Sequence, residues 1–269
     1  MNLVDVHCHL NHELYKEDLD LVLDRAREAG VKTILISGVN PVANKEVLKF
    51  VQRDPQLLKA SLGVYPIDAL GIQPDGVGLP SHPGPIDLDK EFAFFEKNKA
   101  RIIAIGEVGM DFHWASKEET YNKQAEIFRK IIRFTIKLKK PIVIHSRQAE
   151  EECVQILSEE IRNQEIPVVN HCFSGGKSVI KKAAALGHYF SIPPNIVKAS
   201  NFQTLVKLVD LKQLLTETDS PWLSPIKGEK NEPAFVVKSI EKIAEIKGLS
   251  VAEVAEQIWE NYELVFRKN

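Results

Sequence analysis

The chain of 269 residues lacks several features that define specialised protein classes. It has only three cysteines, Cys8, Cys153 and Cys172, an odd number without the spacing of a disulfide framework, which indicates a reducing compartment. No run approaches the roughly 18 apolar residues of a membrane span, and the first residues lack the basic and apolar parts of a signal peptide. The formal net charge of −2 excludes a histone-like coat on nucleic acid but is compatible with a local basic pocket. We therefore expect a cytoplasmic globular protein without a membrane partner.

The chain is long enough and apolar enough to build a core of its own. Its residues are 44% hydrophobic and 27% charged, an ordinary balance for a globular protein. A chain of this size buries roughly three quarters of its unfolded surface, so its folding requires neither disulfides nor a metal. Its length fits one or two average domains, and single α/β barrels of about 250 residues are common.

Short apolar runs alternate with amphipathic stretches along the whole sequence. Several of these runs are continuously apolar, as in parallel strands that are covered on both faces. The eight runs expected to form strands are Leu3–Val6, Thr33–Ile36, Ala60–Val64, Ile102–Ile105, Pro141–Ile144, Ile166–Val169, His188–Ile192 and Leu214–Thr218. Eight such units predict a (β/α)8 TIM barrel that spans residues 1–269 as a single domain. A doubly wound open sheet is the alternative topology.

One region, from Tyr65 to Asp89, does not follow this alternation. It contains five prolines and four glycines. Strand and helix units continue unchanged on both sides of it, which argues against a linker between domains. We expect a long loop over the mouth of the barrel.

The first predicted strand ends in two histidines separated by a cysteine. Residues two apart on a strand share a face, so His7 and His9 project together while Cys8 points away. We expect Cys172, beside the sixth strand, to face away in the same manner and to act as a small packing residue. Paired imidazoles suit a borderline cation such as Zn²⁺. A single pair of this kind is equally compatible with a structural role.

Four further side chains of metal-ligand type stand at the ends of other predicted strands. Glu107 follows the fourth strand, and His145, His171 and Asp219 end the fifth, sixth and eighth. The C-terminal ends of all strands of a TIM barrel surround one mouth, where active sites of this fold lie. Separate structural roles would require five coincidences, so the shared position favours one metal site made from five strands.

Six ligands exceed the needs of one tetrahedral ion and suit two divalent cations that share a carboxylate. Glu107 is the expected bridge, since its two oxygens lie between ligands of the first and fifth strands. Asp219 is expected to bind one ion and to orient or deprotonate the attacking water, so both carboxylates are candidate catalytic residues. Histidine ligands suit Zn²⁺, whereas the carboxylates admit Mg²⁺ or Mn²⁺.

The same segments carry a resemblance to a known family, the TatD-like DNases of the amidohydrolase superfamily. The resemblance covers residues 5 to about 233, in order. Its motifs are His7-Cys8-His9, Gly106-Glu107-Val108-Gly109-Met110-Asp111, His145-Ser146-Arg147, His171-Cys172-Phe173-Ser174-Gly175, Glu217-Thr218-Asp219-Ser220-Pro221 and Lys230-Asn231-Glu232-Pro233. It implies a metal-dependent (β/α)8 barrel that hydrolyses phosphodiester bonds in DNA, often from the 3′ end.

Three positions depart from the family pattern. Tyr65 stands in Gly63-Val64-Tyr65-Pro66 where the family commonly has a histidine near the substrate phosphate, which makes Tyr65 a candidate substrate contact. Met110 replaces a common leucine, and Lys230 replaces the usual arginine. These departures concern substrate preference and leave the metal ligands intact.

Other side chains near the predicted mouth are candidates for substrate contact. Arg147 is placed to hold a phosphate with two N–H groups, and a structural ion pair is the alternative. Trp222 offers an indole for stacking on a base, although core packing explains it equally well. His113 is a further candidate near the mouth, and Asp111 is expected to orient a metal ligand.

Some residues near the motifs have simpler interpretations. The Ser174-Gly175-Gly176 segment precedes a helical stretch and suits either an anion or an ordinary helix cap. We assign no role in the site to His12, His82 or His188.

Three functional classes follow from these features. The first is a divalent-metal-dependent deoxyribonuclease acting on single strands or 3′ ends, with DNA as substrate, which the cationic and aromatic side chains of Arg147, Trp222 and Lys230 favour. The second is a hydrolase of a small-molecule amide or ester, or an aminoacyl-tRNA deacylase, with the same metal site. A non-catalytic metal-holding protein is disfavoured, since Asp219 would have no purpose there.

Overall fold

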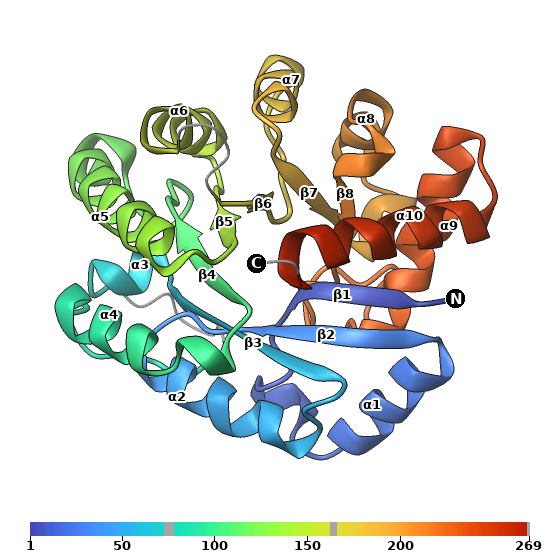
Figure 1. Cartoon of the computed structure of the whole chain (residues 1–269), viewed down its shortest axis with the longest axis horizontal. Coiled ribbons are helices and arrows are strands. Elements are labelled where there is room, and N and C mark those ends of the chain that lie inside the picture. The colour runs from blue at the N-terminus through green and yellow to red at the C-terminus, as the bar shows by residue number, and fades with distance from the viewer. Residues whose placement is uncertain (73–77, 162–165, 268–269) are drawn as a thin grey trace.

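Eight parallel strands form the centre of the computed structural model, which describes residues 1–72, 78–161 and 166–267. Each strand pairs with the next one in the sequence, from β1 to β8 (Figure 1). The strands are β1 (Leu3–Cys8), β2 (Val31–Ser37), β3 (Leu58–Val64), β4 (Ala104–Gly109), β5 (Ile142–His145), β6 (Val168–Asn170), β7 (Tyr189–Ile192) and β8 (Leu214–Thr216). This order confirms the predicted TIM barrel. The alternative of a doubly wound sheet is wrong, because such a sheet reverses its strand order.

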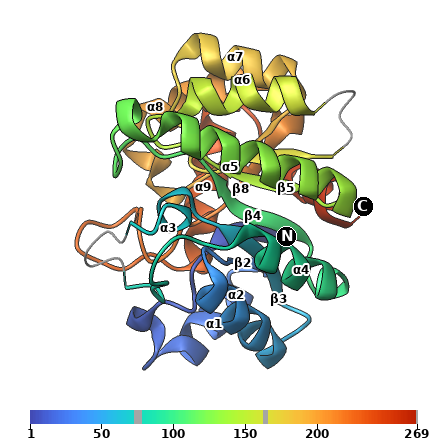
Figure 2. The same cartoon turned by 90° about the vertical axis from the view of Figure 1, so that its left-hand side faces the viewer.

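Helices surround the strands on the outside of the barrel (Figures 1 and 2). They are α1 (Leu19–Glu28), α2 (Pro41–Phe50), α3 (Pro66–Ala69), α4 (Leu88–Lys97), α5 (Lys117–Leu138), α6 (Glu150–Glu160), α7 (Lys177–Ala185), α8 (Ser200–Leu208), α9 (Val236–Lys247) and α10 (Val251–Tyr262). Short helical turns span Glu13–Tyr15, Val51–Arg53, Lys99–Arg101, Pro194–Val197, Leu211–Gln213, Pro233–Phe235 and Glu263–Arg267. No helix within the described ranges has the length and apolarity needed to cross a lipid bilayer.

Local sequence signals set where several helices begin and end. The Asn40 side chain accepts hydrogen bonds from the backbone N–H groups of the first turn of α2, and Pro41 occupies its first position. Ser250 and Glu253 form a reciprocal capping box at the start of α10. Gly248 ends α9 with a φ of 68°, in the left-handed region that glycine adopts at little cost.

The strands have almost no exposed side chains, which explains their continuous apolar pattern. Every residue of β1 and β4 is buried. The fourth strand differs from its predicted range, since β4 begins at Ala104 and runs on through Gly109. Pairing with β5 continues to Gly109, which lies opposite His145. Glu107 therefore lies within the strand instead of following it.

The seam between β8 and β1 is held by the segments that continue each strand. The Asp219 N–H donates to the His7 carbonyl and the His9 N–H to the Ser220 carbonyl, each at 2.9 Å. The buried Asp5 carboxylate accepts hydrogen bonds from the backbone N–H and hydroxyl of Thr218. These contacts bring Asp219 beside the two histidines of the first strand.

The proline-rich region after β3 lies over the mouth of the barrel where it is described. Leu79, Pro80 and Ser81 line a cavity in the mouth. Gly78 has a φ of 68° and lies so close to His12 that a Cβ there would come within 2.1 Å of the imidazole. The part of the predicted loop at 73–77 lies outside the described residues.

Candidate metal centre

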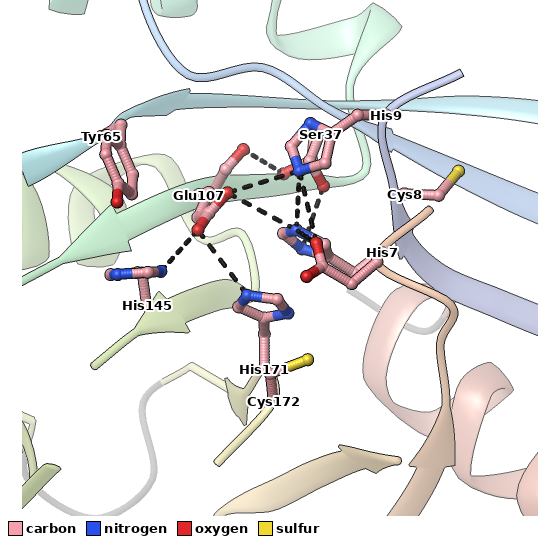
Figure 3. Close-up of polar contacts among 12 residues, drawn as sticks. His7, Cys8, His9, Ser37, Tyr65, Glu107, His145, His171 and Cys172 are labelled. Atoms are coloured by element: carbon pink, nitrogen blue, oxygen red, sulfur yellow. Dashed lines mark hydrogen bonds and ion pairs between the residues drawn. The ribbon is translucent and has the colours of Figure 1, made fainter. Parts of the chain in front are cut away.

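Four of the predicted ligand atoms form a compact cluster at the seam of the barrel (Figure 3). The Nε2 atoms of His7 and His9 lie 3.2 Å apart. They lie 3.5 and 3.6 Å from Glu107 Oε2, and 3.6 and 3.7 Å from Asp219 Oδ1. Ligands around a tetrahedral Zn²⁺ at roughly 2.0–2.2 Å are separated by roughly 3.3–3.6 Å. We call these four atoms the first half of the centre.

The other oxygen of Glu107 faces two histidines from the fifth and sixth strands. His171 Nε2 lies 3.6 Å from Glu107 Oε1, and His145 Nδ1 lies 2.6 Å from it. The buried His145 Nδ1 has no aligned hydrogen-bond partner despite this short distance. Figure 3 shows both rings pointing toward the carboxylate. We call these three atoms the second half of the centre; Glu107 is shared by the two halves.

Glycines let the neighbouring strands approach Glu107 closely. A Cβ on Gly63 would lie 2.2 Å from the Glu107 backbone nitrogen. Gly109 has a φ of 149°, and a Cβ there would lie 1.9 Å from the His145 carbonyl oxygen. Asp219 also has a left-handed φ, of 53°, which costs free energy for a residue with a side chain and is common at functional sites.

Three of the four histidines are anchored through the ring nitrogen that faces away from the cluster. His7 Nδ1 pairs with the Ser37 hydroxyl at 3.1 Å. His145 Nε2 pairs with Asp111 Oδ2 at 2.8 Å, as expected for a carboxylate that orients a ligand. His171 Nδ1 pairs with a carboxylate too, at 2.9 Å. When the outer nitrogen carries the proton, the inner nitrogen has a lone pair directed at the cluster.

Asp111 is itself held firmly in place. Gln124 binds its backbone twice, accepting from its N–H and donating to its carbonyl, both at 2.8 Å. The Tyr65 hydroxyl donates to Asp111 Oδ2 at 2.9 Å. Tyr65 thus contacts the support of His145, in addition to lining the cavity of the mouth.

Glu217 is the carboxylate behind His171, and sequence reasoning missed this role. It is fully buried and also accepts hydrogen bonds from the Cys172 N–H at 2.8 Å and the Ser191 hydroxyl at 2.7 Å. The available signal was its nearness in sequence to Asp219, which it precedes by two residues just beyond the end of β8.

Burial and neighbouring charges shift the pKa values of the ionisable groups of the centre in different directions. Burial lowers the pKa of His9 to about 3, and burial with the nearby His171 lowers the pKa of His7. Burial would also lower the pKa of His171, but Glu217 raises it to about 10. Burial raises the pKa of Asp219 to about 7. His7 and His9 are therefore neutral, the form in which imidazole binds a metal.

Glu107 remains ionised in spite of its burial. Burial would raise its pKa, but the neighbouring imidazoles of His145 and His7 hold the pKa well below its usual range. The donors of both halves are imidazole nitrogens and carboxylate oxygens, the ligand types of Zn²⁺ and of harder divalent cations. The residues present therefore fit divalent cations.

A cavity of about 650 Å³ opens above the centre and contains most of the predicted substrate contacts. Tyr65, Arg147 and Trp222 line it. The Arg147 guanidinium lies 5.7 Å from the ring centre of Trp114, a lining residue that sequence reasoning missed. Among the residues that the structure describes, no carboxylate forms an ion pair with Arg147, so the structural ion pair considered above is wrong.

Several residues lie elsewhere than expected. His113 is exposed beside Gln148 and is not among the described residues that line the cavity. Lys230 forms an ion pair with Asp18 at 2.5 Å and lies outside that lining too, so it does not support a substrate contact. Ser174 donates to Glu150 instead of capping α7.

Two residues to which the sequence assigned no role in the site, Cys172 and His12, lie beside the cavity. The Cys8 side chain points away from the cluster, as predicted (Figure 3), but Cys172, which follows the end of β6 with a left-handed φ of 44°, lines the cavity. The ring of His12 packs against Trp222 with centroids 5.6 Å apart. His188, by contrast, is buried next to Asn170, away from the cavity.

Comparison with known proteins identifies the chain's relatives. The family model described as TatD related DNase matches residues 4–267. A human protein named deoxyribonuclease TATDN3 is 34% identical over 270 residues, which cover all of this chain and 96% of that protein. A Bacillus subtilis protein named uncharacterized metal-dependent hydrolase YabD is 32% identical and covers 99% of this chain and all of its own length. The crystal structure of the TatD homologue YjjV from Escherichia coli has the same fold, with a TM-score of 0.84 at 23% identity over 99% of this chain and 98% of that one. The chain belongs to the family of TatD-related DNases.

Proposed function

We propose that this protein is a divalent-metal-dependent deoxyribonuclease that hydrolyses phosphodiester bonds in single-stranded DNA or at 3′ ends. The observation that carries the proposal is the position of Glu107, whose two oxygens face two separate sets of ligand atoms. The names of the relatives support both the metal dependence and the substrate. A hydrolase of small amides or esters, or an aminoacyl-tRNA deacylase, is not favoured, since the chain shares a family with named deoxyribonucleases along its whole length.

In this proposal the centre holds two divalent cations, of Zn²⁺, Mg²⁺ or Mn²⁺. His7, His9 and Asp219 would hold one cation, His145 and His171 would hold the other, and Glu107 would offer one oxygen to each. Such cations lower the pKa of water and neutralise the charge that develops on a phosphodiester. The anchored outer nitrogens of His7, His145 and His171 keep the rings in the orientation that binding requires.

Asp219 orients the attacking water and accepts its proton. Its half-buried carboxyl lies at the seam and lines the cavity, where a water that enters from the mouth comes within its reach. Its backbone N–H is fixed to the His7 carbonyl, which holds the side chain beside the cluster.

Side chains on the cavity wall bind the DNA. Arg147 has no carboxylate partner among the described residues and holds a phosphate with its parallel N–H groups. Trp222 and Trp114 are 37% and 46% exposed and offer flat faces on which bases stack. Tyr65 fills the place of the family's histidine and, through Asp111, also supports His145.

The proposal is tested by metal removal and restoration. Protein stripped with a chelator should not cleave a labelled single-stranded oligonucleotide, and added Mn²⁺, Mg²⁺ or Zn²⁺ should restore cleavage. A neutral carboxylic ester assayed with the same preparations measures the alternative activity. Rapid ester hydrolysis without DNA cleavage under any of the three metals would contradict the proposal.

A further inference from the structure

A buried carboxylate that is not a predicted metal ligand lies in the wall of the cavity. Asp68, in the short helix α3 that follows β3, is only 9% exposed and lines the cavity. Its Oδ2 accepts a hydrogen bond from Asn40 Nδ2 at 2.7 Å. No lysine or arginine in the described part of the chain forms an ion pair with it. A buried carboxylate with neutral support retains capacity to accept another hydrogen bond.

The orientation of Asn40 fixes this carboxylate. Its Oδ1 accepts from the N–H groups of Val42 and Ala43 at 3.1 and 3.0 Å, so its Nδ2 must face the other way. That nitrogen donates to Asp68 and to the Pro80 carbonyl, both at 2.7 Å. Asn40 thus joins the start of α2, the Asp68 carboxylate and the loop over the mouth into one rigid wall.

The cavity wall beside Asp68 includes the described part of the loop after α3. Leu79, Pro80 and Ser81 line the cavity, and the Pro80 carbonyl accepts a hydrogen bond from Asn40 next to Asp68. Trp114, Trp222 and Arg147 are exposed and follow β4, β8 and β5, so they border other sectors. A DNA strand that continues out of the cavity has room along the exposed sectors, and its end has room beside Asp68.

We propose that Asp68 accepts a hydrogen bond from the terminal 3′-hydroxyl of the DNA and thereby selects 3′-hydroxyl ends against 3′-phosphate ends. This inference rests on the proposed nuclease function and names the chain end that its site takes. A terminal hydroxyl supplies the donor that the carboxylate lacks. A terminal phosphate would bring negative charge against a buried carboxylate without a cationic partner, which is strongly unfavourable. Burial raises the pKa of Asp68 to about 6, and the group is ionised at the mildly alkaline pH chosen for the test.

Three oligonucleotides that differ only at the 3′ terminus test this assignment. They are 5′-labelled single strands ending in a 3′-hydroxyl, a 3′-hydrogen or a 3′-phosphate, cleaved by the metal-loaded full chain at pH 8. We expect kcat/KM to fall by about 10-fold for the 3′-hydrogen strand, which loses one hydrogen bond to a charged group. For the 3′-phosphate strand we expect a fall of about 100-fold or more.

The variant Asp68→Asn keeps the size of the side chain and its bond to Asn40 but removes the charge. It should slow cleavage of the 3′-hydroxyl strand by about 10-fold and accelerate cleavage of the 3′-phosphate strand by about 10-fold. A gain on one substrate cannot come from misfolding. The control Asp20→Asn makes the same change on a carboxylate that is 83% exposed on α1 and should leave both rates unchanged.

Binding to metal-free protein supplies a readout that is independent of turnover. Dissociation constants measured by fluorescence anisotropy should be lowest for the 3′-hydroxyl strand, higher for the 3′-hydrogen strand and highest for the 3′-phosphate strand. Asp68→Asn should abolish these differences in affinity. Equal cleavage of the three strands by the unmodified protein, or unchanged ratios in Asp68→Asn, would overturn the role of Asp68 and leave the nuclease function standing. Cleavage of none of the strands would overturn both.

Discussion

The two halves of the candidate metal centre differ in how their histidines are supported. In the first half, His7 is backed by the neutral hydroxyl of Ser37, and burial lowers the pKa of both His7 and His9. In the second half, His145 and His171 are backed by carboxylates, which raise the pKa of each ring against the effect of burial.

The number of protein donors differs as well. The first half has four candidate ligand atoms, with the two Nε2 atoms 3.2 Å apart and each 3.5–3.7 Å from a carboxylate oxygen of Glu107 and of Asp219, whereas the second has three, at 2.6 and 3.6 Å about Glu107 Oε1. A tetrahedral ion is satisfied by four donors, and a site with fewer protein donors keeps positions for water and substrate. The first half therefore suits retention of an ion, and the second half leaves more positions for water and substrate.

Both halves share Glu107, so the loss of its carboxylate should have the largest effect on metal content and turnover. Glu107→Ala should reduce bound metal from both halves and lower kcat/KM by about 10³-fold or more, because each ion supplies several kcal/mol of transition-state stabilisation. Metal analysis by mass spectrometry and the oligonucleotide assay measure the two effects. Retention of two ions per chain by the variant would contradict the bridging role.

Asp219→Asn separates metal binding from proton transfer in the first half. The amide keeps one oxygen near His7 and His9 but cannot accept a proton, so turnover should fall by about 10²–10⁴-fold. The first half of the variant should keep much of its affinity for Zn²⁺, which titration in a metal buffer would measure. Turnover equal to that of the unmodified protein would remove Asp219 from the mechanism.

Substitution of one supporting residue in each half, Ser37 in the first and Asp111 in the second, allows a direct comparison of the two halves. Asp111→Asn should weaken metal binding in the second half by about 10–100-fold, since it removes the carboxylate behind His145. Ser37→Ala should weaken only the first half, and by less, because a neutral hydrogen bond is lost. Stepwise metal titration of both variants measures the metal affinity of each half separately. Equal effects of the two substitutions on both steps would show that the halves are not independent.

The pH dependence of metal binding should differ between the halves. Raised pKa values of His145 and His171 mean that protons compete with the ion, so second-half affinity should fall as pH falls from 9 to 7.5, by up to about tenfold per pH unit for each proton displaced. First-half affinity should change little in this window, since burial keeps the pKa of His9 at about 3 and that of Asp219 at about 7. Calorimetric titration at the two pH values tests this. An equal fall in the metal affinity of both halves between pH 9 and pH 7.5 would contradict this difference in pH dependence.

The smallest expected effect lies outside both halves. Arg147→Ala should keep the full metal content and raise KM for DNA by about 10-fold, with a milder change in kcat, because the phosphate contact is similar in ground and transition states. Arg147→Lys should rescue only partly, since lysine lacks the forked geometry. Hydrolysis of a neutral ester, if measurable, should be unaffected. An equal loss on both substrates would assign Arg147 a structural role.

Much of the fold could be predicted because each strand is indicated by the pattern of its own residues. Short β-like runs, several of them continuously apolar, marked all eight strands, and five of them carried ligand-type residues at their C-terminal ends. The fourth strand was predicted too short, because Glu107 interrupts its apolar pattern although pairing with β5 continues past it. His113 was chosen for its nearness in sequence, whereas its neighbour Trp114 lines the cavity.

Residues that act through contacts between distant segments left weaker signals. Glu217 supports His171 across 46 positions, and Asn40 supports Asp68 across 28. Neither pair has a spacing that a helix or strand repeat would reveal. Asp68 lies in a proline-rich region whose sequence indicates only a loop.

Strand membership and alternation along the chain are enough to predict the barrel and the six side chains that gather at its mouth, and the motifs are enough to predict the family. The tertiary structure alone decided which nitrogen of each imidazole faces the cluster, how the oxygens of Glu107 divide between two sets, and that Asp68 faces the cavity. These features depend on distances between different strands. Those distances result from the packing of glycines such as Gly63 and Gly109 against neighbouring backbone, which no spacing along one segment encodes.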